Sequence, residues 1–124
     1  MVDLDRMKRA FVNLIENAVD AMPDGGTVTI STKESNGFLE IAFADTGPGL
    51  PKEIMENLWK PLQTTKAKGM GLGLPIVKRI VDAHGGDVSV NSRTGEGTTF
   101  TIRLALKQKQ VEALGQAVGI RAEP

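Results

Sequence analysis

Lys66-Ala-Lys-Gly-Met-Gly-Leu-Gly-Leu-Pro75 is the stretch around which this chain is organised. Its three glycines stand at alternate positions and lead directly into Pro75 and an apolar run with helical spacing, which predicts a glycine-rich loop that opens into a helix. Glycine permits left-handed backbone angles and lets a ligand approach the main chain closely. The free N–H groups of a first helical turn and the helix dipole attract anions, and the two lysines add positive charge. The stretch therefore predicts a phosphate-binding loop.

This pattern differs from two familiar phosphate-binding signatures. No Gly-Lys-Ser/Thr follows a four-residue gap, so the stretch is not a Walker A loop. Leu74 stands where a dinucleotide-binding fingerprint needs its third glycine. Taken alone, the stretch is equally compatible with a plain surface loop before an ordinary helix, because short glycine motifs recur by chance.

Length and composition bound the class of protein. The chain has 124 residues, which fits a single domain with a hydrophobic core. Lys and Arg number 15 and Asp and Glu number 15, so nothing suggests a nucleic-acid surface. The absence of cysteine excludes disulfides and thiolate chemistry and is compatible with the cytoplasm. No apolar run approaches the ~20 residues of a membrane helix, so we expect no membrane segment here, although a longer parent protein could be membrane-anchored.

Hydrophobic periodicity and turn residues divide the chain into helices and strands. The expected helices cover residues 4–22, 51–58 and 74–84, and the expected strands cover residues 27–32, 38–44, 87–91 and 98–106. Asn36-Gly37 predicts a tight hairpin turn between the first two strands. Residues 59–73 lack periodicity, and a loop of that length inside a compact domain is usually functional or mobile. We expect one domain over residues 1–106 and a tail or linker over residues 107–124.

The first expected helix has one apolar side and one polar side. The apolar stripe contains Phe11, Leu14, Ile15, Ala18, Val19 and Met22, and the opposite side contains Arg6, Asn13, Asn17 and Asp20. Two amphipathic helices combined with alternating strands predict one sheet with helices on one face, an α/β two-layer sandwich.

Four clusters, taken in order along the chain, carry a family resemblance. They are Asn13-Leu-Ile-Glu-Asn17, Asp45-Thr-Gly-Pro-Gly49, Gly69-Met-Gly-Leu-Gly73-Leu74 and Gly97-Thr-Thr-Phe100. In this order they resemble the N, G1, G2 and G3 boxes of the GHKL ATP-binding superfamily, and more nearly those of the catalytic ATP-binding domain of sensor histidine kinases. The stretch from Leu58 to Lys66 is similar to the F box of that family, although Lys60 and Gln63 replace the commoner Glu and Phe.

The resemblance implies a Bergerat fold with a mixed, mostly antiparallel sheet packed on about three helices, and ATP held between the long helix and a mobile lid. It implies that Asn17 binds Mg²⁺ through its amide oxygen, assisted by Asn13, since Mg²⁺ takes few hard oxygen ligands from protein. It also implies that Asp45 accepts a hydrogen bond from the exocyclic amine of adenine. The other nucleotide-binding positions that it implies are Gly47, Gly49, Thr65, Lys66, Gly69, Met70, Gly71, Leu72, Gly73, Leu74 and Thr98.

The residue at position 13, an asparagine, helps to distinguish ATP hydrolysis from phosphoryl transfer. Related ATPases such as DNA gyrase carry a water-activating glutamate one turn before the metal-binding asparagine, where this chain has Asn13. An amide is no general base at neutral pH, so hydrolysis is expected to be slow and transfer to a positioned nucleophile is favoured. Glu16 remains a candidate catalytic helper base. The only histidine, His84, continues the apolar stripe of its helix and is expected to pack or cap rather than to accept phosphate.

The resemblance thus implies a histidine kinase catalytic domain that acts on a separate partner. Its acceptor histidine would lie on a dimerisation hairpin elsewhere in the parent protein, and the phosphate would pass to a response-regulator receiver domain. Two alternatives stay open, namely a GHKL-type serine kinase or ATPase and a non-catalytic nucleotide-sensing module. Each cluster alone also has an ordinary explanation, such as a solvated helix face for the two asparagines.

Overall fold

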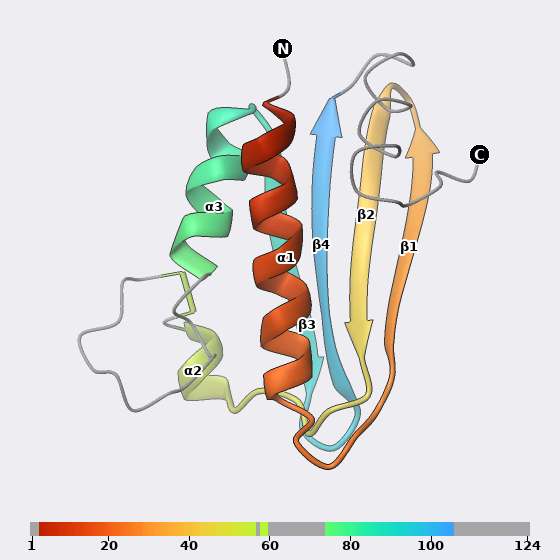
Figure 1. The fold of residues 1–124 in the computed structure, drawn as a ribbon, viewed down its shortest axis with the longest axis vertical. Coiled ribbons are helices and arrows are strands. Elements are labelled where there is room, and N and C mark those ends of the chain that lie inside the picture. Colours follow the sequence, from red (N-terminus) through yellow and green to blue (C-terminus); the bar gives the residue numbers. More distant parts are fainter. Residues whose placement is uncertain (1–2, 57, 60–73, 106–124) are drawn as a thin grey trace.

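The computed structural model describes residues 3–56, 58–59 and 74–105 of the chain. Along this part, one helix is followed by two strands, then two helices and then two more strands, as Figure 1 shows. They are α1 (Leu4–Asp20), β1 (Val28–Ser35), β2 (Phe38–Asp45), α2 (Lys52–Glu56), α3 (Leu74–Ala83), β3 (Asp87–Arg93) and β4 (Gly97–Ala105). Within these ranges, no helix combines the length and the apolar character needed to cross a membrane.

The four strands form one sheet in the order β1-β2-β4-β3, and α1 and α3 pack against each other over one of its faces (Figure 1). This arrangement confirms the predicted α/β two-layer sandwich. All three pairings between the described strands are antiparallel, so the parallel pair that a mixed sheet would need is not among them. The central pair, β2 and β4, sets Asp45 directly opposite Thr98.

The hydrophobic core lies between the helices and the sheet. Its buried members are Met7, Ala10, Phe11, Leu14, Leu39, Ile41, Phe43, Leu58, Leu74, Val77, Ile80, Val81, Val88, Phe100, Ile102 and Leu104. Phe11 of α1 meets Phe43 of β2 edge to face, with the ring centroids 5.3 Å apart. Such an aromatic pair contributes about 0.5–1.5 kcal/mol beyond its buried area. This contact holds α1 against the centre of the sheet.

The start of α1 is set by a side-chain cap. The carboxylate of Asp3 accepts a hydrogen bond from the Arg6 N–H, with Oδ1 and N 3.1 Å apart. A cap of this kind contributes about 1 kcal/mol to helix stability. The helix ends at Asp20, two residues before the predicted end, since Ala21 is its C-cap and Pro23 follows.

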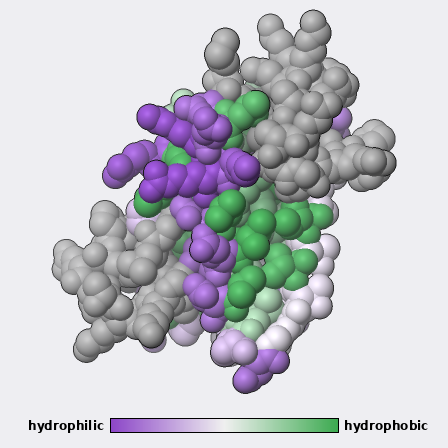
Figure 2. All heavy atoms as spheres, viewed as in Figure 1, coloured by the Kyte–Doolittle hydropathy of each residue, from purple (hydrophilic) through white to green (hydrophobic). Residues whose placement is uncertain are grey.

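The predicted apolar stripe of α1 was wrong at its edge. Val19 is 55% exposed, whereas Met7 and Ala10 are fully buried. The buried side is therefore rotated slightly from the predicted one, because a helical stripe shows its period but not which of its borders meets the sheet. On the face of the molecule that carries α1, Figure 2 shows hydrophobic residues gathered beside a band of hydrophilic ones.

The predicted tight turn is confirmed, because Asn36 and Gly37 have φ angles of 54° and 82°. The other differences from prediction concern the ends of helices and strands. Strand β1 continues three residues beyond its predicted end because Lys33, Glu34 and Ser35 pair with β2, and pairing overrides their weak strand propensity. Helix α2 is shorter than predicted, and β3 extends to Arg93. Residues 60–73 of the expected lid and residues 107–124 of the expected tail lie outside the described residues.

Candidate nucleotide-binding site

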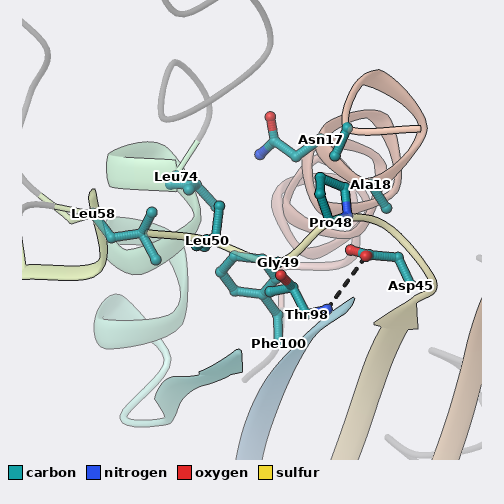
Figure 3. Close-up of a pocket in the computed structure, with 11 residues that line it drawn as sticks. Asn17, Ala18, Asp45, Pro48, Gly49, Leu50, Leu58, Leu74, Thr98 and Phe100 are labelled. Carbon is teal, nitrogen blue, oxygen red and sulfur yellow. Dashed lines mark hydrogen bonds between the residues drawn. The ribbon is translucent and has the colours of Figure 1, made fainter. Parts of the chain in front are cut away.

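A pocket with a cavity volume of about 160 Å³, partly open to solvent, lies at the end of the sheet where β2 stops and β4 begins (Figure 3). Its walls come from α1, from the loop after β2, from Leu58, from the first residue of α3 and from β4. The lining residues are Asn17, Ala18, Ala21, Asp45, Pro48, Gly49, Leu50, Leu58, Leu74, Thr98 and Phe100. Segments distant in sequence thus meet around one mostly apolar space.

Asp45 ends β2 and supplies the carboxylate of the pocket. Its Oδ1 accepts a hydrogen bond from the Gly47 N–H at 2.9 Å and another from the Thr98 N–H at 3.3 Å, the second drawn as the dashed line in Figure 3. The other oxygen, Oδ2, takes part in neither bond. The main chain therefore fixes the orientation of the carboxylate while one oxygen remains available to a ligand.

The loop after Asp45 passes close to the β3–β4 turn. Gly49 has a φ of +80°, and a Cβ at this position would collide with the main chain of Arg93. The Gly95 N–H donates to the Pro48 carbonyl oxygen at 2.7 Å. Only glycine fits both the backbone angle and the close approach at position 49. The close approach is a structural requirement for glycine here, and Gly49 also lines the pocket.

Thr98 is the buried polar residue of the pocket wall, with 6% of its surface exposed. Its hydroxyl lies 2.8 Å from the hydroxyl of Ser92 on β3. Ser92 also accepts from the Leu50 N–H at 2.8 Å and donates to the Gly97 carbonyl oxygen at 3.1 Å. Sequence reasoning missed Ser92, because its link to Thr98 arises only from the β3–β4 pairing.

Asn17 lies across the pocket from Asp45, on α1 (Figure 3). Its Nδ2 atom is buried and has no hydrogen-bond partner within the described residues. Rotating the amide by 180° would place Oδ1 there instead, because the two ends are interchangeable in shape. A buried amide atom that lacks a partner among the described residues, on a side chain that lines a pocket, fits a site completed by a ligand or a cation.

The structure brings together some of the predicted site residues and separates others. Asn17, Asp45, Gly49, Leu74 and Thr98 line one pocket, and Gly47 bonds to Asp45 beside it. Asn13 is half-buried one turn before Asn17 and does not line the pocket, and Glu16 is exposed. Thr65, Lys66, Gly69, Met70, Gly71, Leu72 and Gly73 lie outside the described residues.

The apolar walls include residues that the sequence did not single out as ligand contacts, such as Ala18, Leu50 and Phe100. Trp59 packs edge to face on Phe100, with ring centroids 6.0 Å apart. A pocket with apolar walls and one anchored carboxylate at its base suits a flat aromatic ring that carries a hydrogen-bond donor.

His84 lies away from the pocket, just after α3. Its Nδ1 is 2.7 Å from the Ile80 carbonyl oxygen, and its Nε2 accepts a hydrogen bond from the Asp3 N–H at 2.9 Å. The imidazole therefore joins the end of α3 to the start of α1, which agrees with the predicted capping role.

Comparison with known proteins places the chain in a family. Residues 2–108 match the family described as histidine kinase-, DNA gyrase B- and HSP90-like ATPase. The chain is 43% identical over 105 residues to sporulation kinase C of Bacillus subtilis, covering 85% of this chain and 24% of the relative. It is 41% identical over 110 residues to histidine protein kinase DivJ of Caulobacter vibrioides, covering 83% of this chain and 18% of the relative.

A solved structure shows the same likeness. The catalytic domain of histidine kinase ThkA superposes with a TM-score of 0.74 at 31% identity, covering 84% of this chain and 68% of that one. The chain spans about a quarter or less of the curated relatives quoted above. Fold, motifs and relatives agree, and the chain belongs to the histidine kinase-, DNA gyrase B- and HSP90-like ATPase family, as an ATP-binding catalytic domain of the sensor histidine kinase type.

Proposed function

We propose that this domain binds ATP with Mg²⁺ and transfers the γ-phosphoryl group to a histidine on a separate dimerisation and phosphoacceptor domain of its parent protein. From there the group would pass to an aspartate of a response-regulator receiver domain, in the cytoplasm. The observation that carries the proposal is that one apolar pocket has the anchored Asp45 carboxylate on one side and the buried Asn17 Nδ2 atom, which has no hydrogen-bond partner among the described residues, on the other.

The base of ATP occupies the apolar part of this pocket. Asp45 accepts a hydrogen bond from the exocyclic amine of adenine through Oδ2, since Oδ1 is engaged by the main chain. Thr98 contributes its hydroxyl at the same end. Gly47 and Gly49 allow the loop after Asp45 to pass close to the purine.

The phosphates extend toward α1 and the start of α3. Asn17, assisted by Asn13, would hold Mg²⁺ through neutral oxygens that do not repel the triphosphate, and the metal supplies charge neutralisation. The glycine loop contributes main-chain N–H groups from Gly69, Gly71 and Gly73, with Met70, Leu72 and Leu74 beside them. Thr65 and Lys66 are the side chains that we assign to the γ-phosphate.

The reaction is transfer rather than hydrolysis. An imidazole nitrogen of the acceptor forms a bond to the γ-phosphorus, the bond to the β–γ bridging oxygen breaks, and ADP leaves. The attacking nitrogen is the unprotonated one, and the proton on the other ring nitrogen leaves to solvent or to Glu16, which is exposed on α1 beside Asn17. Because Asn13 cannot activate water, we expect slow steady-state hydrolysis by the isolated domain.

The test mixes the domain with the phosphoacceptor hairpin of its parent and radiolabelled ATP–Mg²⁺. We expect an acid-labile label on the hairpin, as phosphohistidine gives, and its loss in Asn17→Ala. Asn91→Ala, which changes an exposed asparagine of β3, is the matched control. Labelling that survives Asn17→Ala would refute the metal assignment, and an acid-stable label would support a serine kinase. Nucleotide binding that is independent of Mg²⁺ and is accompanied by no labelling would support the non-catalytic nucleotide-sensing alternative.

A further inference from the structure

The hydroxyl of Ser92 sits at a junction of three segments around the pocket. It lies on β3, half-buried, and contacts the Leu50 N–H, the Gly97 carbonyl oxygen and the Thr98 hydroxyl at 2.8, 3.1 and 2.8 Å. Leu50 and Thr98 both line the pocket, whereas Ser92 does not. Ser92 therefore reaches a ligand only through its neighbours.

Counting protons fixes the direction of these bonds. A serine hydroxyl has one proton to donate and two lone pairs to accept with. A carbonyl oxygen can only accept, so the bond to Gly97 uses the proton of Ser92. The Leu50 N–H occupies one lone pair of Ser92. The contact with Thr98 must then be a bond in which the Thr98 hydroxyl donates and Ser92 accepts.

This direction decides what Thr98 can offer to a ligand. With its only proton turned toward Ser92, the Thr98 hydroxyl has lone pairs alone left for the pocket. The neighbouring Asp45 carboxylate is likewise an acceptor. The end of the pocket therefore offers acceptors from two side chains and no side-chain donor between them.

We propose that Ser92 is a positioning residue for base selection: it holds the Thr98 hydroxyl as an acceptor, so that the pocket prefers 6-aminopurine over 6-oxopurine nucleotides. The proposal rests on the nucleotide-binding function proposed above. Adenine presents an amine at this edge, which donates to acceptors. Hypoxanthine presents a carbonyl oxygen there, which would face acceptors without a donor and lose its hydrogen bonds to water.

Without the hydroxyl of Ser92, the Thr98 hydroxyl can rotate and donate to that carbonyl. Ser92→Ala should therefore lower the preference for ATP over inosine triphosphate. One hydrogen bond corresponds to about 0.5–1.5 kcal/mol, so the Kd for inosine triphosphate divided by the Kd for ATP should fall by roughly two- to thirteenfold. The variant also frees the Leu50 N–H, which weakens binding of both nucleotides, and for this reason the ratio rather than the affinity is the test.

The experiment titrates ATP and inosine triphosphate, each with Mg²⁺, into the whole chain and its variants. Ser92→Thr keeps a hydroxyl and should retain the wild-type ratio. Ser89→Ala removes an exposed serine from the same strand and serves as the matched control. In a Thr98→Val background, Ser92→Ala should leave the ratio unchanged, because the group through which it acts is gone.

Two outcomes would overturn the proposal. One is a folded Ser92→Ala protein with the wild-type ratio, and the other is an equal fall of the ratio in the Thr98→Val background. If Ser92→Ala fails to fold, Ser92→Cys replaces it, since a thiol of similar shape is a weak partner and should also lower the ratio. If the wild-type chain binds neither nucleotide, the proposed function falls together with this inference, whereas ATP binding without the change in ratio refutes the inference alone.

Discussion

At the scale of single residues, Asp45 combines a structural and a binding role in one carboxylate. Oδ1 holds the loop and β4 through the Gly47 and Thr98 N–H groups, and Oδ2 is available to the base. A neutral amide in the same shape would preserve the first role and reverse the second, because its NH₂ group is a donor.

We therefore expect Asp45→Asn to raise the Kd for ATP by about tenfold or more while leaving the melting temperature nearly unchanged. Isothermal titration and thermal denaturation measure the two effects. Asp87→Asn, which changes an exposed aspartate at the start of β3, is the control. An unaltered ATP affinity in Asp45→Asn would contradict the role of Oδ2.

The steric requirement for glycine at position 49 can be tested because Gly95 provides a matched control. Gly49 and Gly95 have φ angles of +80° and +83°, but a Cβ at position 95 would meet no atom within 4 Å. Alanine at either position adds the cost of a left-handed backbone, about 1–2 kcal/mol. Gly49→Ala should lower the free energy of unfolding further, because its Cβ also meets the Arg93 main chain. Urea denaturation compares the two variants, and equal losses would show that the loop moves aside without cost.

At the scale of elements, the junction between α1 and α3 depends on a polar contact as well as on packing. His84 accepts from the Asp3 N–H and bonds to the Ile80 carbonyl oxygen, so its Nδ1 carries the proton. Asp3 in turn caps α1. The start of one helix and the end of the other are thus tied through one imidazole.

His84→Ala should lower the free energy of unfolding by about 1 kcal/mol, because two hydrogen bonds are replaced by bonds to water at a partly exposed site. The ATP affinity should stay unchanged, since His84 does not line the pocket. Lys78→Ala, which breaks only the exposed Lys78–Asp82 ion pair of α3, is the control with a smaller expected loss. A large fall in ATP affinity in His84→Ala would show that the junction also controls the pocket.

At the scale of the whole molecule, the antiparallel sheet creates the site because the end of β2 and the start of β4 lie at the same end of the sheet. All the described pocket residues lie between Asn17 and Phe100. We propose on this basis that residues 1–106 form the binding domain and that residues 107–124 are a tail or linker.

Deleting residues 107–124 should leave the Kd for ATP within about twofold of the full chain, since the deletion removes none of the described pocket residues. Ending the chain at residue 96 instead removes β4, a central strand with several buried side chains, and should prevent folding. Titration and circular dichroism of the two truncated chains check the boundary. Loss of ATP binding on removal of residues 107–124 alone would contradict the proposed domain limit.

The resemblance to the GHKL family named Asn17, Asp45, Gly49, Leu74 and Thr98 as nucleotide-binding positions, and these five residues line one pocket. The sequence by itself determined the fold class and the hairpin turn at Asn36-Gly37. These features depend on local rules: hydrophobic period, turn chemistry and motifs of fixed spacing. Each rule applies to a few neighbouring residues, so a prediction made from it does not require knowledge of distant parts of the chain.

Only the tertiary structure decided which border of α1 is buried, how far β1 extends and what Ser92 touches. Val19 is exposed and Met7 is buried because the sheet packs against one border of the apolar stripe of α1. Hydrophobic periodicity in the sequence does not show which border will pack against the sheet. Ser92 acquires its role from pairing between β3 and β4, which places it against Thr98 six positions later and Leu50 far earlier. A hydroxyl in a strand has no sequence signal of its own, because its partners are fixed by register and packing rather than by its neighbours in the chain.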